Sequence, residues 1–316
     1  MNIVLTEGLG IPQALLNQYT DKLEAAGHTF RAYAKTGDVQ ALSDEIRDAD
    51  VIILSNMPLP GAALKACTHL KFIDVAFTGV DHVDLAAAKA AGAVVSNASG
   101  YSTQAVAELA IEMMLSLLRN VPQVEARCRE GKDKTGLVGR ELKGKTVGIV
   151  GLGKIGMNTA RLCQAFGCRV IGTSPSHQSG EVEGVSCMPL EDVLAQSDIV
   201  ALHCPLTPST RGMIDAKAIA RMKDGALLIN LARGPVADTP ALAAALESGK
   251  LGGAGIDVFE TEPPLSTEHP LLHTPNTLVT PHVAFASEES MALRAQIVFE
   301  NLDAFLRGEP QNLVEL

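Results

Sequence analysis

Three polar residues each follow a short apolar run in the second half of the chain. Arg233 follows residues 226–231, Glu262 follows residues 254–258, and His282 follows residues 277–280. Ligands of open α/β sheets bind beyond the carboxyl ends of the strands. A cation, a carboxylate and an imidazole at one such edge would form a candidate catalytic set.

The chemistry that suits this set is reduction of a 2-keto acid, which needs a hydride at C2 and a proton at its oxygen. His282 is the natural proton donor, because histidine changes its charge near neutral pH. Glu262 would fix the tautomer of that ring, and Arg233 would bind the substrate carboxylate through two parallel hydrogen bonds. Each residue alone also has a plain structural interpretation, as a helix cap, a packed ring or a surface charge. Their shared position favours catalysis.

A glycine-rich turn offers a second kind of chemistry. Gly151, Gly153 and Gly156 match Gly-x-Gly-x-x-Gly, with Lys154 and Ile155 between the last two glycines. The turn follows an apolar run at 146–150 and opens a stretch of helical periodicity, which is the context of dinucleotide-binding turns. The first glycine permits the tight turn, the second lets a pyrophosphate approach, and the third lets helix and strand pack closely.

The end of the next apolar run, 170–172, bears on cofactor choice. An acidic residue here would bind the adenosine ribose and favour NAD, but this chain has Thr173 followed by Ser174. Ser174 removes the carboxylate that would repel a 2′-phosphate, yet no Arg or Lys follows to attract one. The sequence therefore favours NAD and permits NADP, with Thr173 and Ser174 as cofactor-binding residues.

The elements that must position these residues follow from length and periodicity. At 316 residues the chain exceeds the roughly 250–300 at which one hydrophobic core stops growing. Short apolar runs alternate with amphipathic stretches, which predicts an α/β fold with parallel sheets. The expected strands are 3–5, 51–54, 72–76 and 94–95, then 146–150, 170–172, 199–203, 226–231, 254–258 and 277–280. A last helix at about 288–306 would return to the first part, so we expect one domain at 1–98 and 288–316 and a second at 99–287.

Two helices are expected from their capping residues. One begins near Thr103 and carries a wide apolar stripe, followed by a polar segment at 119–143. That segment could be a flexible linker, but a wide apolar helix followed by an extended arm is what a dimer interface needs. The interface is favoured, and it predicts a homodimer. Another helix should begin with Thr239 as its cap and Pro240 at its first helical position.

Composition excludes several classes of function. The formal net charge is −10 without a long basic block, which argues against nucleic acid and anionic membranes as partners. No apolar run reaches the roughly 20 residues of a membrane span, and the first residues lack a signal-peptide pattern, so a cytoplasmic protein is expected. The six cysteines show no metal-ligand spacing, and no metal is expected. An acidic protein that binds a carboxylate needs a local cation or backbone amides at the site.

Taken in order along the chain, several motifs resemble those of the D-isomer-specific 2-hydroxyacid dehydrogenase family, over essentially the whole length. They are Thr78-Gly79-Val80-Asp81-His82-Val83-Asp84, Val106-Ala107-Glu108, the glycine turn, His203-Cys204-Pro205-Leu206-Thr207, Asn230 to Gly234, Gly255-Ile256-Asp257-Val258-Phe259, Glu262-Pro263 and Pro281-His282. The resemblance implies a flavodoxin-like substrate domain, into which a Rossmann-type dinucleotide-binding domain is inserted. It also implies dimerisation through the latter.

The resemblance assigns roles position by position. It makes Arg233, Glu262 and His282 the catalytic residues. It places Asp257 beside the nicotinamide carboxamide and places Pro205, Ala232 and Val106 among the cofactor-binding residues. The substrate carboxylate would meet the backbone of Gly79 and Val80. One departure is Asp133, which stands where similar reductases often carry a tryptophan in the dimer arm, so a substrate contact from the partner subunit is in doubt.

The side chain of the substrate should face the loop 55–60, which includes Met57 and Leu59, by the same resemblance. This loop carries no Arg or Lys, which disfavours a phosphorylated substrate. A substrate with a small uncharged side chain fits this loop best, which favours hydroxypyruvate or glyoxylate. The enzyme would use NAD(P)H to reduce either acid to the D-2-hydroxy acid, and it would also catalyse the reverse oxidation. D-lactate dehydrogenase, phosphite dehydrogenase and a non-enzymatic NAD-sensing co-repressor are the alternatives.

Overall fold

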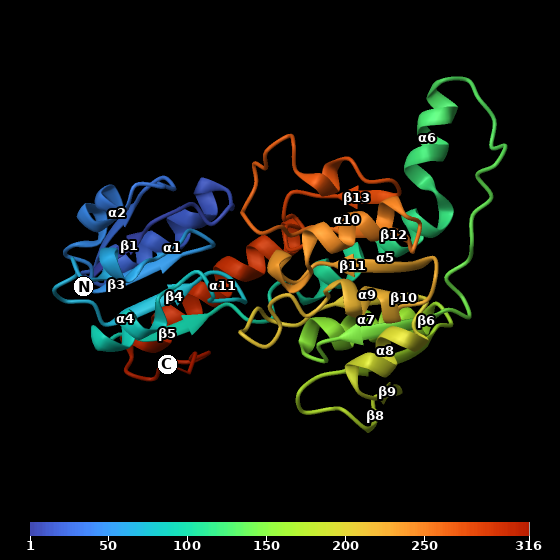
Figure 1. The fold of residues 1–316 in the computed structure, drawn as a ribbon. Helices are drawn as coiled ribbons and strands as arrows, with labels where there is room; N and C mark the ends of the chain where they lie inside the picture. Colours follow the sequence, from blue (N-terminus) through green and yellow to red (C-terminus); the bar gives the residue numbers. More distant parts are fainter. Residues whose placement is uncertain (316) are drawn as a thin grey trace. The chain divides into compact units, whose positions relative to one another are not determined.

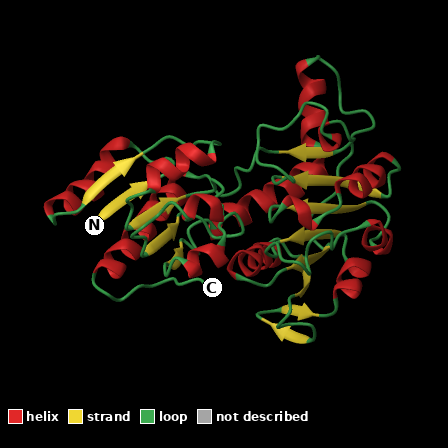
Figure 2. Cartoon of the chain, turned by 60° about the vertical axis from the view of Figure 1, so that its left-hand side comes forward, coloured by secondary structure: helices red, strands yellow, loops and turns green. Residues whose placement is uncertain are grey.

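The protein is described by a computed structural model that covers residues 1–315. Its internal contacts divide the chain into two compact units. The first unit contains Met1–Ser102 and the C-terminal segment that begins at Ala286, and the second contains Thr103–Phe285. The sequence predicted the division at 98/99 and 287/288. Both units are α/β structures built on a mainly parallel sheet, as expected (Figure 2).

The first unit has a five-stranded parallel sheet in the order β2-β1-β3-β4-β5. This is the flavodoxin-like order. The strands are β1 (Asn2–Leu5), β2 (Thr29–Ala32), β3 (Val51–Leu54), β4 (Phe72–Val75) and β5 (Val94–Asn97). β3 and β4 are buried along their whole length, which explains their continuous apolar sequence. β2 was not predicted, because this edge strand is half exposed and has no apolar run.

Helix α11 (Glu288–Leu306) brings the last part of the chain back to this sheet, with the bounds that the sequence predicted. Its N-terminus is fixed by a reciprocal capping box between Ser287 and Ser290. Its apolar face stacks Phe305 on Phe72 of β4, with ring centroids 4.4 Å apart. The other helices of the unit are α1 (Gln13–Ala25), α2 (Val39–Ile46), α3 (Gly61–Leu64) and α4 (Leu85–Ala90).

The second unit has an eight-stranded sheet in the order β13-β12-β11-β10-β6-β7-β9-β8. The six predicted strands are β6 (Thr146–Val150), β7 (Arg169–Thr173), β10 (Ile199–Leu202), β11 (Ala226–Asn230), β12 (Leu251–Ile256) and β13 (Thr277–Val279). All six run parallel. The hairpin β8 (Gly180–Val182) and β9 (Val185–Cys187) was missed, since both strands have only three residues and β8 is mostly exposed.

Helices cover both faces of this second sheet. One face packs against α5 (Thr103–Arg119) and α7 (Lys154–Ala165), and the other against α8 (Leu190–Gln196), α9 (Ala216–Arg221) and α10 (Thr239–Glu247). The two short 3₁₀ helices are η1 (Gly234–Val236) and η2 (Pro270–Leu272). The cap of α10 is Asp238, whose carboxylate accepts from the backbone N–H of Ala241 at 2.8 Å, and not Thr239 as predicted.

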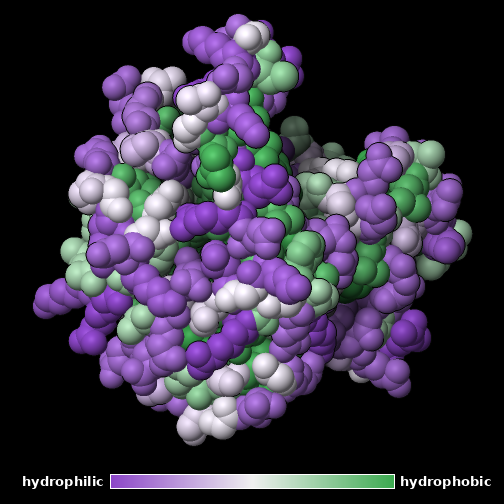
Figure 3. Space-filling model, turned by 90° about the vertical axis from the view of Figure 1, so that its right-hand side faces the viewer, coloured by the Kyte–Doolittle hydropathy of each residue, from purple (hydrophilic) through white to green (hydrophobic). Residues whose placement is uncertain are grey.

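Helix α6 (Val121–Arg129) lies in the polar segment that follows α5. It has no buried residue and projects away from the other helices of its own unit (Figure 1). Apolar side chains gather on the surface beneath it (Figure 3). Within residues 1–315, no helix combines the length and apolar character needed to cross a membrane.

Candidate active site

The glycine turn connects β6 to α7 through a conformation that needs glycine. Gly151 has φ +105°, a left-handed value, and a Cβ on it would lie 2.6 Å from the backbone of His203 and Cys204. A Cβ on Gly156 would lie 1.9 Å from the carbonyl oxygen of Gly151. The turn therefore packs against the end of β10 and folds tightly onto its own helix, as the sequence predicted for the first and third glycines.

The same turn leaves room for a bound phosphate group. A Cβ on Gly153 would meet no atom within 4 Å, so its backbone is open to a ligand at the N-terminus of α7. Lys154 is exposed and Ile155 is half-buried in the first turn of that helix.

Next to the turn, the ring of His203 is buried with no hydrogen-bond partner for either nitrogen among the described residues. Burial lowers the pKa of His203 to about 4, so the ring is neutral and carries one donor and one acceptor for a ligand. These features fit a dinucleotide.

The end of β7 forms a tight polar turn. Backbone hydrogen bonds join Ser174 and His177 in both directions, at 3.1 and 3.0 Å. The Nδ1 atom of His177 lies 3.1 Å from the hydroxyl of Ser174 and 2.9 Å from that of Ser176. The backbone carbonyl of the buried Thr173 accepts from the N–H of Gly151 at 2.9 Å. Two hydroxyls and an imidazole thus stand where an acidic residue would favour NAD, beside the glycine turn.

Arg233 begins the turn after β11, where it was predicted. Its backbone carbonyl accepts from the side-chain amide of Asn230 at 3.0 Å, and its guanidinium donates to the carbonyl of Ala232 at 2.8 Å. A Cβ on the next residue, Gly234, would lie 2.0 Å from the backbone of Phe259, so the turn packs directly against the segment that follows β12. Arg233 is half-buried, and its position is fixed by the backbone on both sides.

Asp257 lies just beyond β12, and its carboxylate holds the segment that carries His282. It accepts hydrogen bonds from the hydroxyl of Thr280 at 2.5 Å and from the backbone N–H groups of Val283 and Ala284, both at 2.9 Å. The backbone carbonyl of Asp257 accepts from the N–H of His282 at 2.8 Å. Burial raises the pKa of Asp257, and the hydrogen bonds to its charged form oppose that rise. This anchoring was not foreseen, and the predicted role beside the nicotinamide stays a prediction.

His282 and Glu262 form a direct pair. The Nδ1 atom of His282 lies 2.9 and 2.8 Å from the two carboxylate oxygens of Glu262. The His282 backbone is left-handed, with φ +56°, and its ring meets Phe285 edge-on at 5.4 Å. Only 12% of the His282 side chain is exposed, against 49% for Glu262. This strained backbone and the carboxylate together aim the Nε2 atom away from Glu262.

Arg233, Glu262 and His282 therefore follow three adjacent strands, β11, β12 and β13. Backbone hydrogen bonds run from Asp257 to Asn230 at 3.1 Å and from His282 to Asp257, which joins the three strand ends. Of the other residues predicted for the cofactor, Ala232 and Val106 are buried in this unit and Pro205 is exposed after β10.

The residues predicted to bind substrate in the first unit fall into two kinds. Gly79 and Val80 are half-buried in the loop after β4, and among the described residues their N–H groups donate no hydrogen bond. These two N–H groups can therefore donate hydrogen bonds to a bound anion. In contrast, Met57 and Leu59 are 1% and 0% exposed, so they pack in the core of this unit. Asn56 and Pro58 are the more exposed residues of that loop.

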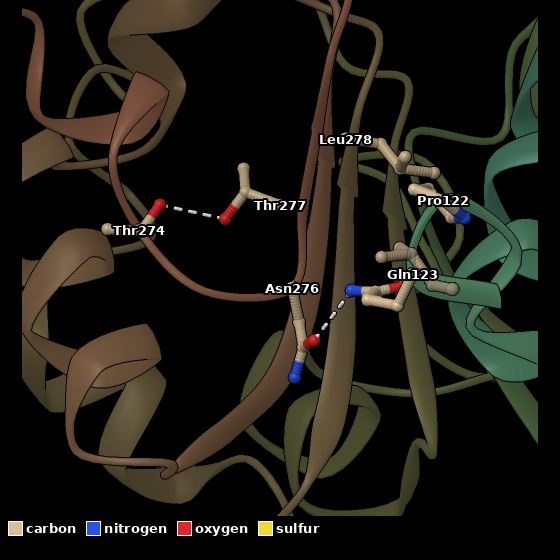
Figure 4. Close-up of a pocket in the computed structure, with 7 residues that line it drawn as sticks. Pro122, Gln123, Thr274, Asn276, Thr277 and Leu278 are labelled. Atoms are coloured by element: carbon tan, nitrogen blue, oxygen red, sulfur yellow. Dashed lines mark hydrogen bonds between the residues drawn. The ribbon is translucent and has the colours of Figure 1, made fainter. Parts of the chain in front are cut away.

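A separate small pocket of about 90 Å³ lies at the base of α6. Its lining includes Leu117, Pro122 and Leu278 (Figure 4). Gln123 of α6 donates to Asn276, just before β13, at 3.0 Å. This pocket lies beside β13 and away from the glycine turn, which follows β6 four strands away in the sheet.

Comparison with known proteins agrees with this geometry. Residues 111–284 match the model of the D-isomer specific 2-hydroxyacid dehydrogenase NAD binding domain. A hydroxypyruvate reductase of Blautia hydrogenotrophica is 36% identical over an alignment of 305 positions that covers 92% of this chain and 93% of that protein. A glycerate dehydrogenase of Methylorubrum extorquens is 38% identical, covering 91% of this chain and 92% of that one.

A solved structure extends the likeness to three dimensions. The crystal structure of a glyoxylate reductase from Paecilomyes thermophila superposes with a TM-score of 0.89 at 30% identity, over 99% of this chain and 98% of that one. The chain therefore belongs to the D-isomer specific 2-hydroxyacid dehydrogenase family: it is an oxidoreductase that uses a nicotinamide dinucleotide and acts on small hydroxy and keto acids.

Proposed function

We propose that this enzyme reduces hydroxypyruvate or glyoxylate to the D-2-hydroxy acid and catalyses the reverse oxidation. The observation that carries the proposal is the pairing of His282 with both oxygens of Glu262, at the sheet edge that also holds Arg233 and the glycine turn. A proton donor, a cation and a dinucleotide-binding turn at one edge are what reduction of a 2-keto acid requires.

Each residue has a separate task in this proposal. The Glu262 carboxylate accepts a hydrogen bond from the Nδ1–H group of His282. The ring, protonated on both nitrogens, then gives its Nε2 proton to the oxygen on C2 as charge develops there and is left neutral with its proton on Nδ1. The guanidinium of Arg233 binds the substrate carboxylate and polarises the carbonyl. Asp257 keeps His282 in place through the backbone at 282–284. When bound, the nicotinamide dinucleotide supplies the hydride.

The backbone amides of Gly79 and Val80 are proposed as further ligands of the substrate carboxylate. Their lack of hydrogen-bond partners among the described residues supports this role. A protein with a net charge of −10 repels an anionic substrate unless hydrogen-bond donors or a cation lie at the binding site, and these amides would be such donors. Backbone N–H groups can supply a local positive potential that the molecule as a whole lacks.

The choice of substrate rests on the loop 55–60 and on the relatives. The loop has no cation of its own, which suits an uncharged side chain. Relatives that cover nearly the whole chain bear the names hydroxypyruvate reductase and glycerate dehydrogenase, and a similar solved structure is a glyoxylate reductase. These names support the two substrates proposed.

For the cofactor we propose NAD, with NADP also accepted. The turn after β7 offers two hydroxyls and His177, and it lacks both the carboxylate that selects NAD and the arginine that selects NADP. Thr173 and Ser174 would lie at the adenosine ribose.

We also propose a homodimer formed through the second unit. Helix α6 has no buried residue, and Val121 and Val138 of this segment are 46% and 85% exposed. A second copy would cover these side chains and the surface at the base of α6 (Figure 3). Light scattering coupled to size-exclusion chromatography should give about twice the chain mass of 33.2 kDa.

The deciding assay follows oxidation of NADH and of NADPH at 340 nm with hydroxypyruvate, glyoxylate, pyruvate and phenylpyruvate. Turnover of hydroxypyruvate or glyoxylate above the other two acids is expected. Preference for pyruvate would make the enzyme a D-lactate dehydrogenase. Folded protein that binds cofactor but reduces no keto acid would contradict the proposal. In that case, NAD-dependent oxidation of phosphite would identify the enzyme as a phosphite dehydrogenase.

A further inference from the structure

Glu7 is a buried carboxylate just beyond β1, and no role predicted from the sequence uses it. It is 5% exposed. Its Oε1 atom accepts hydrogen bonds from the backbone N–H of Ser55 at 2.9 Å and from that of Met57 at 2.6 Å. Hydrogen bonds to an ionised acceptor are roughly twice as strong as neutral ones. Glu7 therefore clamps the first half of the loop 55–60, where β3 ends.

Lys35 approaches the same loop. Its Nζ atom donates to the side-chain oxygen of Asn56 at 2.9 Å and lies 3.8 Å from Oε2 of Glu7. The fold thus brings a cation to a loop that has none in its own sequence, and the charge of Glu7 offsets that cation. The pair leaves the loop close to electrical neutrality and fixes Asn56, a half-buried polar side chain of the loop.

The base of this clamp is itself anchored. The guanidinium of Arg294 in α11 donates to the carbonyl of Leu9 at 2.5 Å and lies over the ring of Tyr101 at 5.7 Å. The charge of Glu7 also acts on that guanidinium. A Cβ on Gly10 would collide with Met291 of the same helix at 2.3 Å. The segment that carries Glu7 is therefore held against α11.

The far end of the loop is tied to the segment that follows Gly79 and Val80. The N–H of Leu59 donates to the carbonyl of His82 at 2.9 Å, and the N–H of Asp84 donates to the carbonyl of Leu59 at 3.0 Å. Glu7 at one end and this pairing at the other leave little freedom to the residues between them. A loop held at both ends can discriminate between side chains, because it cannot rearrange to fit each one.

We propose that Glu7, with Lys35, is a positioning residue that sets the enzyme's specificity for the group attached to C2 of the keto acid. By holding the backbone at Ser55 and Met57, it presents Asn56 to a small, polar, uncharged substituent such as hydroxymethyl. The inference rests on the proposed function, in which the loop 55–60 faces the substrate's side chain.

The test compares two substrates in one protein. Hydroxypyruvate carries a hydroxymethyl group on C2, whereas glyoxylate carries only hydrogen there. Glu7→Ala should raise KM for hydroxypyruvate about tenfold or more, the effect of losing one to two strong hydrogen bonds, and should change KM for glyoxylate by less than about twofold. Glu7→Gln keeps an Oε1 acceptor and should restore most of the hydroxypyruvate affinity. Glu24→Ala, which removes an exposed carboxylate of α1, is the matched control.

Hydrogen exchange gives a readout that does not depend on activity. The amides of Ser55 and Met57 should be protected in the wild type and in Glu7→Gln, and should exchange faster in Glu7→Ala. An equal rise of KM for both substrates would overturn the specificity role, and unchanged exchange would overturn the clamp. Wild-type enzyme that reduces neither acid refutes the proposed function and the specificity role with it, whereas the exchange result still decides the clamp.

Discussion

The imidazole of His282 faces the Glu262 carboxylate with both oxygens within hydrogen-bond distance of its Nδ1 atom, at 2.9 and 2.8 Å. The carboxylate therefore sets which nitrogen carries the ring proton. Such a pair is expected where a ring protonated on both nitrogens gives up its Nε2 proton and keeps the one on Nδ1. The left-handed backbone at His282 is held by the buried Asp257, so the ring position depends on contacts along the segment 280–284.

His282→Ala should lower kcat for keto-acid reduction by roughly 10²–10⁴-fold, because it removes one acid–base group. Steady-state kinetics at 340 nm measures the loss. Binding of NADH, followed by quenching of its fluorescence, should stay within about twofold, since His282 acts on the substrate oxygen. A kcat near that of the wild type would remove His282 from the mechanism.

Arg233→Ala should raise KM for the keto acid and also lower kcat. The guanidinium is proposed to bind the substrate carboxylate in the ground state and the polarised carbonyl in the transition state, so both constants should change. Arg221→Ala is the control, because Arg221 is an exposed cation of the same unit at the end of α9. An unchanged KM in Arg233→Ala would deny the guanidinium its binding role.

Ser174→Asp should shift cofactor preference towards NADH. A carboxylate at the end of β7 accepts hydrogen bonds from the ribose hydroxyls and repels a 2′-phosphate, so KM for NADPH should rise at least about tenfold relative to KM for NADH. Ser179→Asp adds the same charge at an exposed position five residues further on and should leave the ratio unchanged. If both variants shift the ratio alike, the effect is one of net charge and not of the ribose site.

The sequence predicts the fold best where burial forces a pattern on it. β3 and β6 have the predicted bounds because both are apolar along most of their length. The edge strand β2 and the hairpin β8–β9 escaped prediction, since β2 and β8 are largely exposed and β9 has only three residues, so none of them has a long apolar run. The cap of α10 was misplaced by one residue, because Asp238 and Thr239 are adjacent and both are good capping residues.

In the candidate site too, some features could be predicted from the sequence and others could not. That Arg233 and His282 follow strand ends could be predicted from the spacing of the apolar runs, while their catalytic roles stay predictions. The contacts that hold them could not: Asp257 binds backbone amides 26 and 27 residues further on, and Glu7 binds amides 48 and 50 residues away. Nearly every residue has the same backbone N–H and C=O groups, so the sequence does not show which of them a side chain will bind. For the same reason, the packing of Met57 and Leu59 in the core was not expected from their place in a loop.

Asp74 in β4 gives a prediction about stability. Its side chain is fully buried against α11, where the amide of Asn301 donates to Oδ1 at 3.1 Å, and Oδ2 has no partner among the described residues. Burial raises the pKa of Asp74 to about 8. In the unfolded chain an aspartic acid titrates near 3.9. Between these values the folded protein keeps a proton that the unfolded chain has released, so this group makes the free energy of unfolding fall as pH rises, by up to about 1.4 kcal/mol per pH unit.

Asp74→Asn should remove that dependence, because asparagine keeps the Oδ1 acceptor for Asn301 and cannot ionise. The variant should be more stable than the wild type at pH 7–8, and the difference should shrink as the pH is lowered towards 5. Urea unfolding followed by circular dichroism at pH 5, 6, 7 and 8 measures both profiles. Asp21→Asn, at an exposed position of α1, should leave the profile unchanged. Parallel profiles for Asp74→Asn and the wild type would mean that Asp74 is ionised in the folded protein, with its charge compensated inside the first unit.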